Sequence, residues 1–311
     1  MLLVWFLVSV FSFAIIYFAP GDPLSMYMTP EAMGRKLTEV EMKELRTSLG
    51  LDGNIVEQYV NWLSKFMSGN LGISLNNRLP VMRQILEKLP CTIGLMGASL
   101  VIALVLSIPL GLLAGANENK WIDNIISQFS YLGVSIPAFW LGIMLIVIFS
   151  MKLRWFPSSG IRTIGENSLG DLVRHAVLPA FVLSLNHMAV FVRYIRSNVI
   201  VQLKEEYVQT AISKGFSDWV VLYRHVLKNC MLPVITIAGS RLSRLISGSF
   251  IIESVFAWPG LGTLGVNAVN GRDYPMIMGI TMFSCTLLLL GNLIADLLYG
   301  FADPRIKLGK E

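Results

Sequence analysis

Charged residues are scarce in this sequence. Only 14% of its 311 residues are Asp, Glu, Lys or Arg, whereas a soluble domain usually carries about a quarter. Apolar residues make up 54% of the chain and the mean hydropathy is +0.62. This balance predicts an integral membrane protein and argues against a secreted scaffold, a disordered chain or a soluble nucleic-acid binder. The net charge of +5 does not indicate nucleic acid, because membrane proteins keep Lys and Arg on their cytoplasmic loops.

Motifs for catalysis and for metal binding are also missing. The three cysteines, Cys91, Cys230 and Cys285, are far apart and form no CxxC pair, which argues against a disulfide framework or a zinc site. No G-x-x-x-x-G-K-[ST], H-E-x-x-H or G-x-S-x-G sequence occurs, so the chain has no P-loop for ATP. None of the three histidines is followed by a metal-ligand residue three or four positions later. We therefore expect no catalytic residue, no metal site and no cofactor in this chain.

Long apolar runs are what the sequence has instead. A helix needs about 20 mostly apolar residues to cross the hydrocarbon core, and six segments reach that length. They are approximately Met1–Ala19, Thr92–Ala116, Ile125–Met151, Leu172–Val192, Leu232–Phe256 and Met276–Phe301. The first has no basic leader and no evident cleavage site, so we expect a permanent helix and not a signal peptide. The sequence thus predicts an all-α, polytopic membrane protein with six transmembrane helices.

The distribution of charge predicts the orientation. Arg193–Lys228 holds six basic and three acidic residues, and the tail from Asp303 holds three and two, whereas residues 20–90 are balanced at eight and eight. The loop Lys152–Arg174 holds four basic and two acidic residues, which weakens this contrast. Because cytoplasmic loops are enriched in Lys and Arg, we place both termini and Arg193–Lys228 in the cytoplasm. The expected divisions are a first transmembrane helix (1–19), an extracytoplasmic segment (20–90), a five-helix transmembrane core (91–301) with a cytoplasmic loop (201–230), and a tail (302–311).

The extracytoplasmic segment is expected to contain short amphipathic helices. Thr38 and Glu41 fit a capping box, and Asn54 with Glu57 opens a second helix that ends before Gly69. The apolar stripe of this second helix is predicted to comprise Val56, Val60, Leu63 and Met67. Such helices lie on the outer ends of the spans, or form part of a docking surface for an extracytoplasmic partner, and the two interpretations are compatible.

One element of the predicted cytoplasmic loop is distinctive. The residues from Leu203 predict a helix that stops at Gly215, in a left-handed conformation, before a second helix that follows Ser217. The i, i+3, i+4, i+7 spacing predicts one shared face for Tyr207, Thr210, Ala211 and Lys214. This face has small residues at its centre and a basic residue at its end, so it is suited to insertion into a groove of another protein. The alternative is an interfacial helix that rests on the membrane.

The run Glu206–Gly215 resembles the cytoplasmic loop of permease subunits in binding-protein-dependent ABC importers. The usual Glu-Ala-Ala-x-x-x-Gly of that family occurs here as Gln209-Thr-Ala-x-x-x-Gly215. Further matches follow in family order along almost the whole chain: Pro20-Gly-Asp-Pro23, Gly69-Asn-Leu-Gly-Ile-Ser74, Gly133-Val-Ser-Ile-Pro-Ala-Phe-Trp140, Phe156-Pro-Ser-Ser-Gly160, Phe256-Ala-Trp-Pro-Gly-Leu-Gly262, Arg272-Asp-Tyr-Pro275 and Asp303-Pro-Arg305. They are similar to the first of the two permeases in dipeptide, oligopeptide and nickel importers. Two positions depart from the family pattern, Asn70 for an aspartate and Arg241 in a span that is usually uncharged there.

The resemblance implies the type I permease architecture of ABC importers, as a multi-pass protein of the inner (cytoplasmic) membrane. The implied partners are a second, different permease, two ATPases that bind ATP and Mg, and an extracytoplasmic binding protein, with the lipid bilayer around the permeases and no nucleic acid. The residues implied to couple the chain to an ATPase are Gln209, Thr210, Ala211, Lys214 and Gly215. The implied substrates are short peptides, with nickel or a nickel chelate as the alternative. The alternative of another class is an ion channel or a stand-alone secondary carrier, although a carrier usually shows an internal repeat and none is evident.

Four polar residues within the predicted spans are candidates for the translocation pathway. Arg241 and Arg244 share one helix face, and a charge at the bilayer centre costs about 2.5–3.5 kcal/mol, so they should face a cavity or a partner. They suit an anionic group such as a peptide carboxylate; alternatively they pair with the second permease or reach the cytoplasmic interface. His187 in the fourth span is either a transit ligand for a metal or a hydrogen-bonded packing residue. Asp296 in the sixth span is expected to face the interior.

Overall fold

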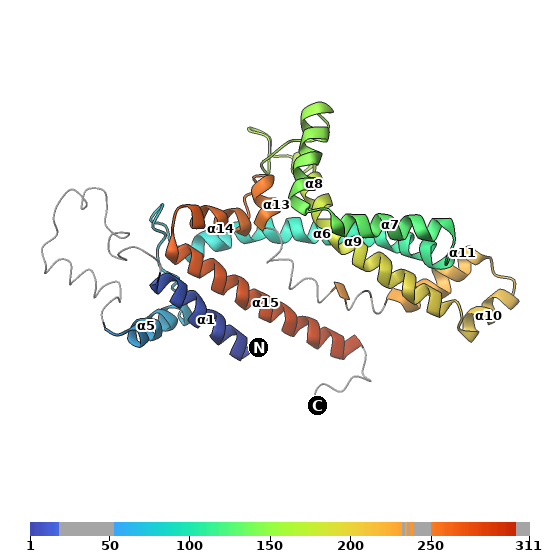
Figure 1. The fold of residues 1–311 in the computed structure, drawn as a ribbon, viewed down its shortest axis with the longest axis horizontal. Helices are drawn as coiled ribbons and strands as arrows, with labels where there is room; N and C mark the ends of the chain where they lie inside the picture. Colours follow the sequence, from blue (N-terminus) through green and yellow to red (C-terminus); the bar gives the residue numbers. More distant parts are fainter. Residues whose placement is uncertain (19–52, 232–233, 235–236, 239–249, 303–311) are drawn as a thin grey trace, which may run out of the picture. The chain divides into compact units, whose positions relative to one another are not determined.

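The computed structural model describes residues 1–18, 53–231, 234, 237–238 and 250–302, and all regular structure within them is helical apart from one β-bridge (Figure 1). The bridge joins Ile73 and Pro80. The helices are α1 (Leu2–Tyr17), α5 (Ile55–Met67), α6 (Val81–Ala116), α7 (Trp121–Ser135), α8 (Ala138–Leu145), the π-helical η1 (Ile146–Lys152), α9 (Leu169–Gln202), α10 (Glu206–Ser213), α11 (Asp218–Val220), the π-helical η2 (Val221–Val226), α13 (Phe250–Val255), α14 (Leu261–Asn270) and α15 (Tyr274–Ala302). The predicted all-α fold is confirmed.

Three helices of the described chain are long and apolar enough to cross a membrane. They are α6, α9 and residues Tyr274–Leu293 of α15, which correspond to the second, fourth and sixth predicted spans. α6 starts at Val81, earlier than the predicted Thr92, because the helix continues through Pro90. Its length of 36 residues therefore includes the end of the segment predicted to be extracytoplasmic.

The third predicted span is broken. α7 and the α8–η1 helix meet at a bend of 98° next to Pro137, and together they are long and apolar enough to form one membrane span. Proline cannot donate a backbone hydrogen bond and disfavours helical geometry in the preceding residue, which accounts for the bend at Pro137. The first predicted span appears as α1, a shorter apolar helix of 16 residues. The fifth lies largely outside the described residues, which include 234, 237–238 and its last part, with α13.

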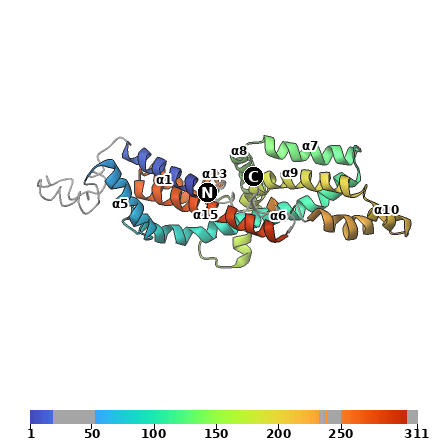
Figure 2. The same cartoon turned by 90° about the horizontal axis from the view of Figure 1, so that it is seen from below.

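The chain divides into two compact units, and the first comprises the described parts of 1–89 and 264–289. In this unit α1 lies along α15 (Figures 1 and 2), and Trp5 Nε1 donates a hydrogen bond to Thr286 Oγ1 at 2.9 Å. Buried Asp273 accepts a hydrogen bond from the Ser74 hydroxyl, and its other oxygen accepts one from the backbone N–H of Met276 at 3.3 Å. These bonds tie the loop before α6 to the first turn of α15.

Helix α5 begins at the predicted capping box but packs on a different face. Asn54 Oδ1 accepts a hydrogen bond from the N–H of Glu57 at 2.9 Å, and Glu57 Oε2 accepts one from the N–H of Asn54 at 3.1 Å. The residues that meet α1 are aromatic: Tyr59, Trp62 and Phe66. The predicted stripe is mostly exposed, at Val56, Val60 and Met67. Aromatic side chains bury more apolar area than Val or Met, so their face and not the predicted one is turned inward. Thr38 and Glu41 lie outside the described residues.

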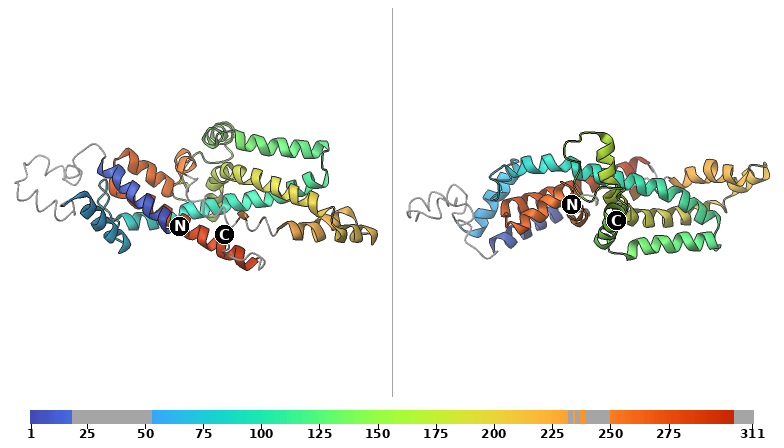
Figure 3. Two further views of the ribbon diagram at one scale, coloured as in Figure 1. Left: turned by 60° about the horizontal axis from the view of Figure 1, so that its bottom comes forward. Right: turned by 90° about the horizontal axis from the view of Figure 1, so that it is seen from above.

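The second unit holds α7, α9 and most of α6, which run side by side (Figures 2 and 3). α6 approaches α9 closely at two glycines four residues apart. A Cβ atom at Gly111 would lie 2.6 Å from the Cβ of Ile195, and one at Gly115 would lie 2.6 Å from the Cβ of Val199. This is the small-x-x-x-small pattern that allows close helix packing within membranes. Only glycine fits these two positions without moving α9.

Candidate functional site

The loop predicted at 201–230 forms a helical cap at the end of α9 (Figure 1). α9 ends at Gln202 and α10 begins at Glu206, so a short turn joins the two helices. Val208 and Ala211 of α10 are buried and belong to the same hydrophobic core as the end of α9. α10 also packs against η2. The burial of one face therefore fixes which face of α10 is left at the surface.

Two side-chain hydrogen bonds add to this packing. The Tyr207 hydroxyl donates to Gln202 Oε1 at 2.6 Å, which links α10 to the last turn of α9. Gln209 Nε2 donates to the backbone oxygen of Leu203 at 3.3 Å, which links α10 to the connecting turn. Any displacement of α10 must therefore be passed to the end of α9 or break these bonds.

Gly215 ends α10 in the left-handed conformation that the sequence predicts, with φ of +83°. The N–H of Gly215 donates to the oxygen of Ile212 at 2.9 Å, and the N–H of Phe216 donates to the oxygen of Ala211 at 3.3 Å. This pair of bonds is the Schellman motif, in which the left-handed position favours glycine. A Cβ atom on Gly215 would meet nothing within 4 Å, so the requirement for glycine comes from the backbone and not from crowding.

The exposed face of the cap is part polar and part aromatic. Of the predicted coupling residues, Gln209, Thr210 and Lys214 are exposed, whereas Ala211 is buried and seats α10 on its own chain. Successive residues of a helix point about 100° apart, so Thr210 and Ala211 fall on opposite sides of the boundary between surface and core. The exposed apolar residues around them are Ile212, Phe216, Trp219 and Tyr223. The rings of Trp219 and Tyr223 stack with centroids 5.7 Å apart.

A buried carboxylate that the sequence interpretation did not single out organises the turn after α13. Glu253 is fully buried, and its carboxylate accepts hydrogen bonds from Thr92 Oγ1 at 2.8 Å and from the N–H of Gly262 at 2.6 Å. Thr92 Oγ1 in turn accepts the N–H of Leu261 at 2.8 Å. The Trp258 indole donates to a backbone oxygen of α6 at 3.0 Å. The motif 256–262 thus forms the turn between α13 and the start of α14, and Glu253 fastens it to α6 and to the first turn of α14.

The predicted pathway residues are only partly described. Arg241 and Arg244 lie outside the described residues. His187 is a half-buried residue of α9, and Asp296 lies in α15, with its side chain outside the described part. Within the described residues, no group of three or more His, Cys, Asp or Glu side chains is arranged to hold a metal ion. Of the four side chains only that of His187 is described, so the role of these residues in a pathway stays a prediction.

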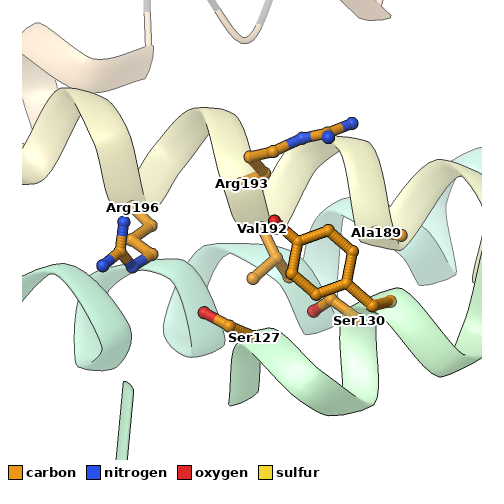
Figure 4. Close-up of a pocket in the computed structure, with 7 residues that line it drawn as sticks. Ser127, Ser130, Ala189, Val192, Arg193 and Arg196 are labelled. Atoms are coloured by element: carbon orange, nitrogen blue, oxygen red, sulfur yellow. The ribbon is translucent and has the colours of Figure 1, made fainter. Parts of the chain in front are cut away.

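A pocket opens between α7 and α9, next to the ion pair of Arg196 with Asp123 (Figure 4). It has a volume of about 130 Å³ and is lined by Ser127, Ser130, Tyr131, Ala189, Val192, Arg193 and Arg196. Small-molecule sites usually have volumes of about 300–1,000 Å³, so this pocket is too small for a peptide.

Comparison with protein families gives two matches that together cover nearly the whole chain. Residues 107–308 match the family described as binding-protein-dependent transport system inner membrane component, and residues 1–96 match the N-terminal family of the same membrane component. Both the α9–α10 cap and the turn fastened by Glu253 lie within the first match.

Curated relatives are similar over almost their full lengths. The chain is 41% identical to the oligopeptide transport system permease protein AppB of Bacillus subtilis, over 96% of this chain and 94% of the relative. It is 34% identical to the di/tripeptide transport system permease protein DppB of Pseudomonas aeruginosa, over 97% of this chain and 95% of the relative. Among solved structures, the inward-facing MetNI methionine ABC transporter matches with a TM-score of 0.56 at 16% identity, over 71% of this chain and 97% of that chain.

Proposed function

Because the chain belongs to the family of binding-protein-dependent transport system inner membrane components, we propose that it forms half of the translocation pathway for short peptides in an ATP-driven importer. The observation that carries the proposal is the cap at the end of α9. It presents an exposed surface on α10 and is anchored through Val208 and Ala211 to the core of the membrane helices. When a partner displaces this surface, the displacement can be transmitted to α9.

The proposed complex contains this chain, a second and different permease, two ATPases and an extracytoplasmic binding protein. ATP and Mg are bound by the ATPases, since this sequence has no P-loop. The orientation that fits the charge distribution places α10 and both termini in the cytoplasm. This chain would act as a non-catalytic subunit.

The proposed coupling is a rigid-body switch between two states. An ATPase cleft receives the exposed residues of α10, with Gln209, Thr210 and Lys214 at the contact. Closure of the ATPases moves α10, and the bonds of Tyr207 and Gln209 carry the displacement to α9. The coupling requires the ATPases to bind the two states of the permease with different affinities. A partner that binds both states equally tightly does not shift the equilibrium between them.

Short peptides are the proposed substrates because the curated relatives are oligopeptide and di/tripeptide permeases. Nickel transport, the alternative that the motifs leave open, is not favoured by any of these relatives. Arg241 and Arg244 remain proposed contacts for a peptide carboxylate or for the second permease.

The test is complementation of uptake in cells that lack the gene. Cells that express the chain with its partner subunits should take up radiolabelled dipeptides or oligopeptides, and deletion of the chain alone should abolish this uptake. Radiolabelled nickel serves as the competing substrate. Uptake of nickel without uptake of peptide would overturn the proposed substrate class.

A further inference from the structure

Two arginines of α9 line the α7–α9 pocket, and one of them has no direct partner within the described residues. Arg196 is paired with Asp123, through Nε to Oδ1 at 2.5 Å and Nη2 to Oδ2 at 2.7 Å. Arg193 is exposed, and within the described residues its guanidinium has no hydrogen-bond or ion-pair partner. Glu118 also lies close enough to act electrostatically on Arg196, and the guanidinium of Arg193 is the one at the pocket that is unpaired within the described residues. Figure 4 shows Arg193 and Arg196 projecting from α9 in different directions, and Ser127 and Ser130 on α7.

The position of the pocket along α9 indicates the depth at which it lies. α9 has 34 residues, about 51 Å of helix, so it is about 20 Å longer than the hydrocarbon core is thick. Arg196 and Arg193 precede the end of α9 at Gln202 by about 9 and 14 Å. Their long side chains therefore reach the boundary between the hydrocarbon and the headgroups. That end of α9 leads into α10, which the proposed orientation places in the cytoplasm.

Exposed aromatic residues occur on both helices that form the pocket, with Trp121 about 15 Å away from Tyr131 along α7. Trp121 and Tyr131 of α7 and Tyr194 of α9 are 70%, 60% and 45% exposed. Trp and Tyr are enriched where membrane proteins meet the headgroup region, because their rings are apolar and carry a polar tip. Tyr131, which lines the pocket, and Tyr194, the neighbour of Arg193 in the sequence, are thus residues of the kind found at the membrane interface.

We propose that the α7–α9 pocket binds the phosphate group of an anionic phospholipid from the cytoplasmic leaflet. A phosphate accepts hydrogen bonds at several oxygens, and Arg193, the free N–H groups of Arg196 and the Tyr131 hydroxyl are donors of the matching kind. Basic pockets between transmembrane helices on the cytoplasmic side are suited to acidic headgroups. The volume of about 130 Å³ accepts a phosphate group, and the acyl chains would remain in the bilayer. The bound lipid would brace α7 against α9, next to the coupling cap. This inference rests on the proposed orientation but does not depend on the substrate.

The test uses the purified complete importer in detergent, with native mass spectrometry of bound lipid. Phosphatidylglycerol and phosphatidylcholine with the same acyl chains are titrated in parallel, with inorganic phosphate and glycerol phosphate as soluble competitors. Phosphatidylglycerol should bind more tightly than phosphatidylcholine. Arg193→Gln should weaken its binding about tenfold, a loss equivalent to about 1.4 kcal/mol, and Arg193→Lys should restore most of it. Lys204→Gln removes one charge from an exposed residue outside the pocket and should leave binding unchanged.

Three results would overturn the inference. They are equal binding of the two lipids, unchanged phosphatidylglycerol binding by Arg193→Gln, and full displacement of the lipid by soluble phosphate at millimolar concentration. The last of these would assign the pocket to free phosphate instead. Peptide uptake by the same preparation is measured separately, so a failure of lipid binding is distinguishable from a failure of the proposed transport function.

Discussion

Arg196 of α9 holds Asp123 of α7 through two parallel hydrogen bonds, with distances of 2.5 and 2.7 Å. The side chain of Asp123 is 2% exposed and that of Arg196 is 29% exposed. The N–H of Asn119 donates a further bond to Asp123 at 2.9 Å, so the carboxylate also organises the turn before α7. This arrangement joins the two helices beside the cap that we propose as the coupling surface.

Removal of one partner of this pair should destabilise the membrane domain. Arg196→Met leaves a buried carboxylate without its counter-charge, which typically costs about 3–5 kcal/mol. We expect a clear fall in the thermal stability of the purified importer, and a smaller fall for the double variant Asp123→Asn/Arg196→Met. Breaking the exposed pair of Arg83 and Glu87, whose side chains are 69% and 56% exposed, should change stability by less than about 1 kcal/mol. Equal effects of the buried and exposed changes would contradict this account.

The glycine contact between α6 and α9 should be intolerant of even one methyl group. Gly115→Ala places a Cβ atom 2.6 Å from that of Val199, and forced overpacking usually costs about 1–3 kcal/mol. Gly97→Ala is the matched control in the same helix, because a Cβ atom there would meet nothing within 4 Å. The measurement is the yield of assembled importer and its melting temperature. If Gly97→Ala and Gly115→Ala behave alike, α6 and α9 are not packed through this contact.

Gly215→Val should uncouple the cap without unfolding the membrane domain. A left-handed residue with a Cβ atom costs roughly 1–2 kcal/mol, and a β-branched side chain adds to that cost. Because no atom lies near a Cβ at this position, the effect should come from re-aiming α10 and Phe216. The expected result is weaker retention of the ATPases and loss of transport, with pairing to the second permease intact. Asparagine tolerates the left-handed conformation, so Gly215→Asn should retain more ATPase binding and more transport than Gly215→Val.

Full ATPase retention together with full uptake by Gly215→Val would mean that α10 does not couple. The two variants are compared at equal abundance in the membrane, so that a difference in expression is not read as a difference in binding.

Loss of the Glu253 carboxylate should loosen the turn between α13 and α14. Glu253→Ala removes the acceptor for the Thr92 hydroxyl and for the N–H of Gly262, and each buried donor left without a partner costs about 1–3 kcal/mol. We expect faster proteolysis at the turn and a lower melting temperature. Glu253→Gln keeps one acceptor oxygen and should have an intermediate effect. A turn that stays protected in Glu253→Ala would show that its conformation does not depend on this carboxylate.

Local features of this fold are readable in the sequence because they depend on neighbours in the chain. The capping box of Asn54 with Glu57 and the left-handed Gly215 both rest on contacts a few residues apart. The bend at Pro137 is equally local. Helix periodicity likewise predicts the apolar spans that appear as α6, α9 and α15.

Other features depend on contacts between distant segments, which periodicity does not specify. Thr92 meets Glu253 across 161 positions, and Asp123 meets Arg196 across 73. Periodicity also groups Ala211 with Thr210, although the packing of α10 against η2 and the surrounding core buries Ala211. The glycine contact was within reach of sequence reasoning, because Gly111 and Gly115 form a G-x-x-x-G pattern in an apolar helix.

The most direct test of the central claim is peptide uptake by the importer reconstituted into liposomes. The complete complex, with its extracytoplasmic binding protein and ATP, should accumulate labelled peptide, and removal of the ATPases or the binding protein should abolish accumulation. This chain alone should neither hydrolyse ATP above a blank nor transport the peptide. ATP-specific hydrolysis by the lone chain, or uptake that persists without the ATPases, would contradict the account and favour a stand-alone carrier or channel.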